Sequence, residues 1–266
     1  MTPRRCAVGF VLVVAVAPAT AGLGAALQPD RAPGQVTLAV DASVAAPPFD
    51  RTSALLPATM APFEARLAPA ARAAFSAGVS NLKAGNVLAA ELAFKRAIAS
   101  DADSTASLAY LAVTYAASGH DAEAASAWQL ALANGSDLQQ IYHWLGGALV
   151  RSRDLAEARA IYEEAIGRWP DEARFVVPLA AIDASLGRGA QAFARLETYL
   201  AGGHDDPAAL YVAIDWLHQL HAARTSVHGI AEDVALARTW ADRYAKAGGP
   251  NLAVVRRWVE ELSRER

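Results

Sequence analysis

Residues 90–97 read AELAFKRA, and three later segments repeat this pattern of small and large apolar residues. The later copies are residues 124–131 (AASAWQLA), 158–165 (ARAIYEEA) and 192–199 (AFARLETY). Each copy begins 34 residues after the previous one. The fourth copy is degraded, because Leu196 replaces the central aromatic residue and Tyr199 replaces the last alanine. A fixed period of this length predicts an array of helical repeats.

A second pattern precedes these segments and indicates the first helix of each repeat. Its members are spaced as one helix face, at Leu108, Leu111, Ala112 and Tyr115 and again at Tyr142, Leu145, Gly146 and Leu149. Gly85, Gly119 and Gly187 occupy the turns between paired helices, where a left-handed residue is favoured. Arg153 stands at the corresponding place in the third repeat. We therefore expect that turn to be tighter or rotated.

Together these motifs resemble the tetratricopeptide repeat (TPR). The resemblance implies an all-α, α-α superhelix (TPR solenoid) over residues 70–206, with units at 71–104, 105–138, 139–172 and 173–206. No unit of this kind buries its apolar face alone, so neighbouring units stack and share a core. We expect Phe94, Trp128 and Tyr162 to fill that core between units.

Residues 207–266 predict a divergent fifth unit and a C-terminal capping helix. A helix at 207–221, an insertion at 222–231 and a helix at 232–246 form the expected unit, and an amphipathic helix at 251–264 then covers the end of the stack. The long interruption and the AGGP segment at 247–250 carry a second likeness. From Phe49 onward the chain resembles the helical region that follows von Willebrand A domains in some secreted bacterial proteins.

The N-terminus predicts export and then an irregular tether. Residues 1–21 combine paired arginines, an apolar stretch and a small-residue end, as a signal peptide does. The alternative is an uncleaved anchor in the inner membrane, since residues 6–27 carry no charge. Residues 22–69 form a Pro-rich linker, in which we expect a short strand at 36–40 and a short docking helix within 49–67.

Composition and motifs argue against a catalytic function. The net charge of −3 gives no basic surplus for nucleic acid, and the single cysteine, Cys6, precedes the predicted cleavage point. We find no phosphate-binding loop and no nucleophile or metalloprotease motif. His218 and His221 lie one turn apart on a predicted helix, with His204 in the preceding loop, but two imidazoles without a fixed third ligand are a weak metal signal. We therefore predict no catalytic residue, no metal and no cofactor.

The resemblance to TPR proteins implies a concave groove lined by the first helices, and this groove is the predicted binding site. Its apolar side chains would hold a peptide, and its arginine or lysine side chains would fix a carboxylate. The predicted groove residues are Arg72, Phe75, Val79, Lys83, Val113, His143, Arg151, Arg174, Tyr211, Asp215 and His218.

We therefore expect a non-catalytic protein–protein interaction scaffold, exported to the periplasm or secreted, in a bacterial cell envelope. Its partner would be a protein or peptide, and a membrane only if the N-terminal segment stays uncleaved. The alternative is a structural or assembly subunit of an envelope complex, which would use its end or convex surfaces.

Overall fold

The computed structural model describes residues 38–39, 42–46, 48–102 and 104–264, so the predicted signal peptide lies outside the described residues. Regular structure in this part of the chain is helical, and the strand expected at 36–40 is not seen at Leu38 or Ala39. The helices are α1 (Ala42–Ala45), α2 (Arg51–Ala54), α3 (Pro57–Glu64), α4 (Pro69–Lys83), α5 (Val87–Ser100), α6 (Thr105–Ala117), α7 (Asp121–Ala133), α8 (Gln139–Arg151), α9 (Leu155–Arg168), α10 (Ala173–Ser185), α11 (Gly189–Ala201), α12 (Pro207–Ala222), α13 (Ile230–Lys246) and α14 (Leu252–Arg264).

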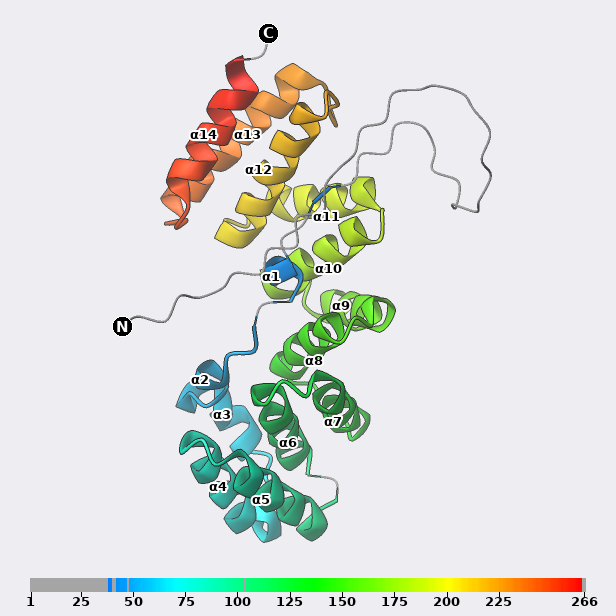
Figure 1. Ribbon diagram of the computed structural model, residues 1–266, viewed down its shortest axis with the longest axis vertical. Coiled ribbons are helices and arrows are strands. Elements are labelled where there is room, and N and C mark those ends of the chain that lie inside the picture. The colour runs from blue at the N-terminus through cyan, green and yellow to red at the C-terminus, as the bar shows by residue number, and fades with distance from the viewer. Residues whose placement is uncertain (1–37, 40–41, 47, 103, 265–266) are drawn as a thin grey trace, which may run out of the picture.

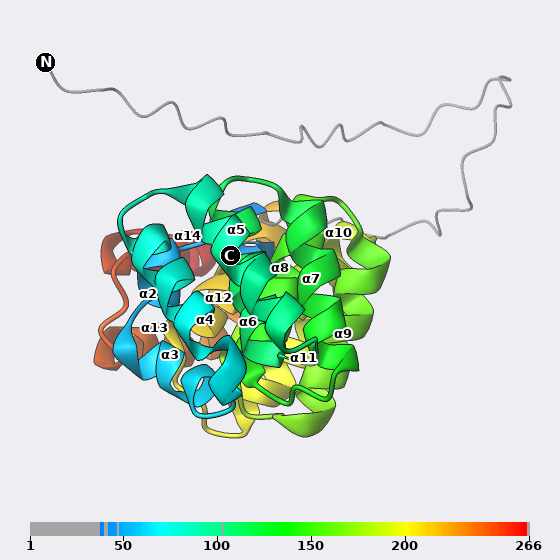
Figure 2. The same cartoon turned by 90° about the horizontal axis from the view of Figure 1, so that it is seen from below.

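Helices α4 to α13 form five antiparallel hairpins that stack into a solenoid. Each first helix packs against its partner, and those from α6 onward also pack against the hairpin before them. Figure 1 shows the stack from α4 at the bottom to α14 at the top, and Figure 2 looks along it from below. Phe94, Trp128 and Tyr162 are fully buried, which confirms their predicted place in the core. The all-α repeat architecture is therefore confirmed.

Small residues set the close approach of the paired helices. A Cβ atom on Gly78 would lie 2.6 Å from the ring of Phe94, and one on Gly146 would overlap the ring of Tyr162. A side chain at either glycine would therefore force the two helices of the hairpin apart. The same separation in sequence between each glycine and its aromatic residue therefore reflects one repeated contact.

The turn at Arg153 corrects one expectation. Gly119 has φ of 78°, and Arg153 adopts nearly the same left-handed conformation, with φ of 68°. The backbone hydrogen bonds match as well, since Asp154 N–H donates to Leu149 and His120 N–H donates to Tyr115. The third turn is therefore neither tighter nor rotated, and the stack retains an arginine in a conformation that favours glycine.

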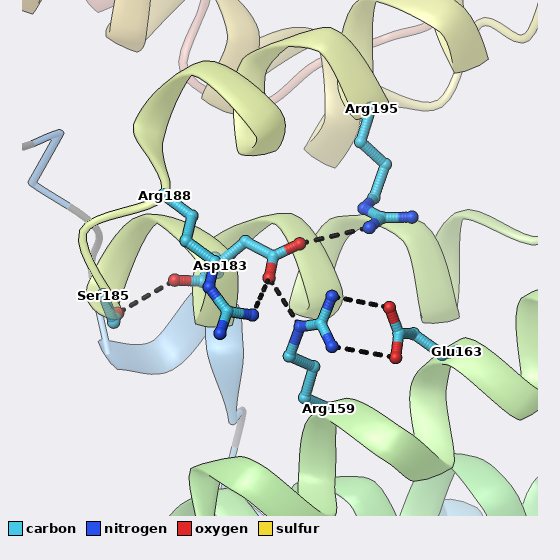
Figure 3. A network of polar contacts seen from close by, with 7 residues as sticks. Arg159, Glu163, Asp183, Ser185, Arg188 and Arg195 are labelled. Atoms are coloured by element: carbon cyan, nitrogen blue, oxygen red, sulfur yellow. Dashed lines mark hydrogen bonds and ion pairs between the residues drawn. The ribbon is translucent and has the colours of Figure 1, made fainter.

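A buried carboxylate connects the third and fourth hairpins. Asp183 of α10 is fully buried, and it accepts hydrogen bonds from Arg159 of α9 at 2.8 Å and from Arg195 of α11 at 3.1 Å (Figure 3). Arg188 lies 3.7 Å away, and Glu163 binds the outer edge of the Arg159 guanidinium. Three helices are therefore held through one acidic side chain.

The last hairpin follows its predicted outline. The insertion becomes the loop between α12 and α13, and buried Asp233 accepts hydrogen bonds from the backbone N–H groups of Val227 and His228 in that loop. Helix α14 packs against both α12 and α13 and so covers the end of the stack. Within the described residues, no helix is both long and apolar enough to span a bilayer.

Candidate functional site

The first helices α4, α6, α8, α10 and α12 form one side of the solenoid, which we call the inner face. The chain N-terminal to the repeats folds back on this side. Helices α2 and α3 pack against α6, and α1 packs against α10, as Figure 1 shows. The short docking helix expected within residues 49–67 is present as α3. The predicted groove is therefore partly covered by the protein's own segment, residues 38–67, which we call the N-terminal strap.

Aromatic side chains fix the second half of the strap. Phe63 of α3 stacks on Trp144 of α8 with ring centroids 5.8 Å apart, and its edge meets Tyr110 of α6 at 5.3 Å. Phe49 lies 5.9 Å from both Trp128 and Trp144. The Tyr110 hydroxyl donates a 2.9 Å hydrogen bond to the carbonyl of Ala54. This part of the strap belongs to the core.

The start of the strap is held by polar groups of α12. Gln219 Oε1 accepts a hydrogen bond from the Ala39 N–H at 2.7 Å, and Gln219 Nε2 donates one to the Ala39 carbonyl at 3.1 Å. Trp216 Nε1 donates to the same carbonyl at 3.3 Å. The side chain of Leu38 is buried in the C-terminal core, while Ala39 is exposed. The backbone of Ala39 is thus the recognised feature here.

Three predicted groove residues are not open to a partner. Phe75, Val79 and Val113 are buried in the N-terminal core. Phe75 lies 5.4 Å from Tyr110, whose ring also contacts Phe63 of the strap. These three side chains therefore lie in the core and not on an open surface, and their predicted role in binding stays a prediction.

Three of the predicted groove residues, each with a charged or titratable side chain, lie at the middle of the inner face. His143 borders a cavity of about 210 Å³ between α8 and Phe49. Burial, assisted by the positive charge of Arg174, lowers the pKa of His143 to about 4. Arg151 binds Asp121 at 2.8 Å, and Arg174 binds Glu172 at 2.9 Å. These cations already have acidic partners within the chain.

Helix α14 covers two of the predicted residues on α12. The ring of Tyr211 lies 5.1 Å from that of Trp258, and His218 stacks on Trp258 at 5.7 Å. His218 Nε2 also lies 2.7 Å from a carboxylate oxygen of Glu261. Tyr211 and His218 therefore contribute to the capping contact as well as to the inner face.

The remaining predictions lie at the edges of this surface. Asp215 accepts a 2.8 Å hydrogen bond from Gln219 Nε2, and burial raises the pKa of its carboxyl group. Arg72 and Lys83 are exposed on α4. Whether any of the eleven predicted residues contacts a partner stays a prediction. In the part of the chain that the structure describes, no cluster of three or more His, Cys, Asp or Glu side chains is placed to hold a metal ion.

Sequence reasoning missed Gln219 and Trp216, which bind the strap most directly. Gln219 follows His218 by one position and falls in the last turn of α12. The side-chain amide of Gln219 indicates a binding role only once the backbone of Ala39 is seen beside it. The sequence indicated a docking segment before the repeats, but it did not indicate where the first residues of that segment would lie.

Comparison with known proteins agrees with this architecture. A family model described as tetratricopeptide repeat matches residues 149–213. The solved structure of pilF from Pseudomonas aeruginosa is 24% identical with a TM-score of 0.53, and the match covers 73% of this chain and 88% of pilF. MamA is 16% identical with a TM-score of 0.56, over 69% of this chain and 96% of MamA. These structures share the fold, and the curated proteins give no match.

Proposed function

Because a tetratricopeptide-repeat model matches residues 149–213 and the stacked hairpins have the fold of such repeats, we propose that this chain is a non-catalytic scaffold that binds a protein or peptide segment on its inner face. Stacked hairpins of this family present an extended surface that suits protein partners. One observation supports the assignment above the others. The inner face of this chain holds a polypeptide, since α1 to α3 and residues 38–39 lie along it.

The compartment is part of the same proposal. Residues 1–21 have the three-part composition of a signal peptide, which favours the periplasm or the extracellular space, and arginine far outnumbers lysine, as in GC-rich bacterial genomes. A chain retaining these residues uncleaved would be anchored in the inner membrane instead. N-terminal sequencing of the protein from its native envelope distinguishes the two, because cleavage after Ala21 leaves Gly22 first.

A second candidate function uses the opposite side of the solenoid. Leu88 and Leu92 on α5 are 79% and 52% exposed, and Leu130 on α7 is 55% exposed. Leu88 and Leu92 are four residues apart and so share one helix face. Apolar side chains on the outer helices favour an assembly subunit that packs into a larger envelope complex.

Site-specific photocrosslinking in the native envelope separates the two functions. A photoreactive residue at Gln140 reports on the inner face, because Gln140 lines two cavities that strap residues also border. The same residue at Leu92 reports on the outer face. We expect a discrete adduct from position 140 that is absent from position 92. The reverse pattern would support the assembly subunit, and no adduct from either position would contradict both.

A further inference from the structure

The two ends of the N-terminal strap are bound in different ways. Met60 and Phe63 are 3% and 2% exposed, and they pack in the same core as the repeat residues. Ala39 is exposed and is held through its backbone alone. The first kind of contact is part of the fold. The second resembles the way a protein holds a separate extended peptide.

The amide of Gln219 is suited to reading a backbone. It accepts from the N–H and donates to the carbonyl of the same residue, so it satisfies both backbone groups of Ala39. Asp215 accepts from Gln219 Nε2 at 2.8 Å, which fixes the amide with Oε1 toward the Ala39 N–H. Trp216 supplies a second donor to the carbonyl. This arrangement requires an extended residue with a free N–H.

The neighbouring residue supplies the apolar part of the recognition. Leu38 is 4% exposed and borders a cavity of about 600 Å³ between α11 and the loop after α12. Phe193, Leu220 and Val227 line the same cavity. The cavity leaves room beyond the leucine, so a larger apolar side chain would also fit. Ala39, by contrast, is exposed and contacts the indole of Trp216 and the amide of Gln219 through its backbone groups.

We propose that Gln219, Trp216 and the cavity beside Leu38 form a peptide site for a segment in which a large apolar residue precedes a residue with a free backbone N–H. Leu38 and Ala39 occupy this site in cis and compete with such a segment from a partner. The inference rests on the proposed function and deepens it, because it names the ligand class and its regulation. A tethered competitor acts at an effective concentration on the order of millimolar, so a partner must displace it.

The test uses the full chain and a labelled peptide of sequence VTLAVD, which copies residues 36–41. The variant Ala39→Pro removes the N–H that binds Gln219, while leaving the receptor residues intact; Ala39→Ser keeps the N–H and serves as the matched control. Losing one hydrogen bond in cis frees the site, so we expect the Ala39→Pro chain to bind the peptide about fivefold more tightly than the control by fluorescence anisotropy. Adding Gln219→Ala to Ala39→Pro should remove most of that binding.

The following outcomes would overturn the proposal. One is an Ala39→Pro chain with unchanged circular dichroism that binds the peptide no better than Ala39→Ser. Another is binding that Gln219→Ala leaves intact. A third is a wild-type dimer, detected by sedimentation, that Ala39→Pro dissociates, since the strap would then bind a second copy. If Ala39→Pro fails to fold, Leu38→Ser releases the same site and takes its place.

Failure of this inference is distinguishable from failure of the proposed function. The peptide assay addresses only the site on α12, whereas the crosslink from Gln140 reports on the middle of the inner face. A crosslink without peptide binding would keep the scaffold function and reject the site. Peptide binding without a crosslink from Gln140 would keep the site on α12 and reject binding of a partner at the middle of the inner face.

Discussion

Phe63 of α3 stacks on Trp144 of α8, with ring centroids 5.8 Å apart and ring planes inclined by 11°. Phe63 precedes the first repeat unit, whereas Trp144 belongs to the third unit. Phe63 is 2% exposed and Trp144 is 6% exposed. The strap thus completes the core that the first three hairpins leave open.

Truncation of Phe63 should therefore destabilise the whole N-terminal half. We expect Phe63→Ala to lower the free energy of unfolding by about 3–5 kcal/mol, because it leaves a cavity between α6 and α8. Leu56→Ala is the control, since Leu56 is 49% exposed and should change the free energy by less than about 0.5 kcal/mol. Urea unfolding followed by circular dichroism measures both. Equal midpoints for the two variants would mean that the strap is not part of the core.

A pair of glycine substitutions tests the packing that defines the repeat. Gly146→Ala places a methyl group against the Tyr162 ring, and we expect a loss of about 1–3 kcal/mol in the free energy of unfolding. Gly167→Ala, on the neighbouring helix α9, meets no atom within 4 Å and should stabilise the protein by about 0.5–1 kcal/mol through helix propensity. Opposite signs in thermal unfolding would confirm the role of Gly146. Stabilisation by both substitutions would contradict it.

The repeated contacts are the part of the fold that the sequence predicts best. The chain repeats one packing contact at a fixed spacing, because each repeat needs a large side chain in the same gap between hairpins. The residues that fill it are Phe94, Trp128 and Tyr162. Arg153 shows the limit of this reasoning. The packing of helices α8 and α9 on either side of Arg153 favours the left-handed turn strongly enough that an arginine adopts φ of 68°. A single departure from a repeated pattern therefore changed the residue and left the geometry unchanged.

The strap is the part that periodicity could not predict. Phe49 and Phe63 stand among prolines and follow no helical period, yet their rings meet Trp128 and Trp144 far along the sequence. Such contacts occur once, so no repetition reveals them. The same limit applies to the site. Predicting an open groove from the first helices could not take account of the strap, and Phe75 and Val113 lie buried in the core.

The network around Asp183 predicts unequal effects from its two acidic residues. Asp183 is fully buried and joins Arg159 and Arg195, whereas the Glu163 side chain is 41% exposed. We expect Asp183→Asn to cost about 1–3 kcal/mol of the free energy of unfolding, because the arginines lose their charged acceptor between the hairpins. Glu163→Gln should cost less than about 0.5 kcal/mol, as exposed pairs do. Chemical denaturation at matched salt measures the difference, and similar costs would show that the buried carboxylate has no special role.

His143 predicts an acid-sensitive step in stability. Burial lowers its pKa to about 4 in the folded chain, whereas an unfolded histidine titrates near pH 6.5. Between these values the unfolded chain binds more protons, so this contribution to stability is complete above about pH 6.5 and is lost as the pH falls toward 4. At pH 4.5 the loss amounts to about 2–3 kcal/mol.

The variant His143→Gln isolates this effect from the titration of carboxylates, which both proteins share. Glutamine fills a similar volume and stays neutral, so the variant should lose about 2 kcal/mol less than the wild type between pH 7 and pH 4.5. Urea unfolding at several pH values gives the two profiles. Nδ1 of His143 is buried and meets no hydrogen-bond partner among the described residues, and the backbone hydrogen bond with Arg174 offsets only part of the effect of burial on the pKa of the ring. Parallel profiles would show that the histidine becomes charged without cost, and so that water reaches it in the folded protein.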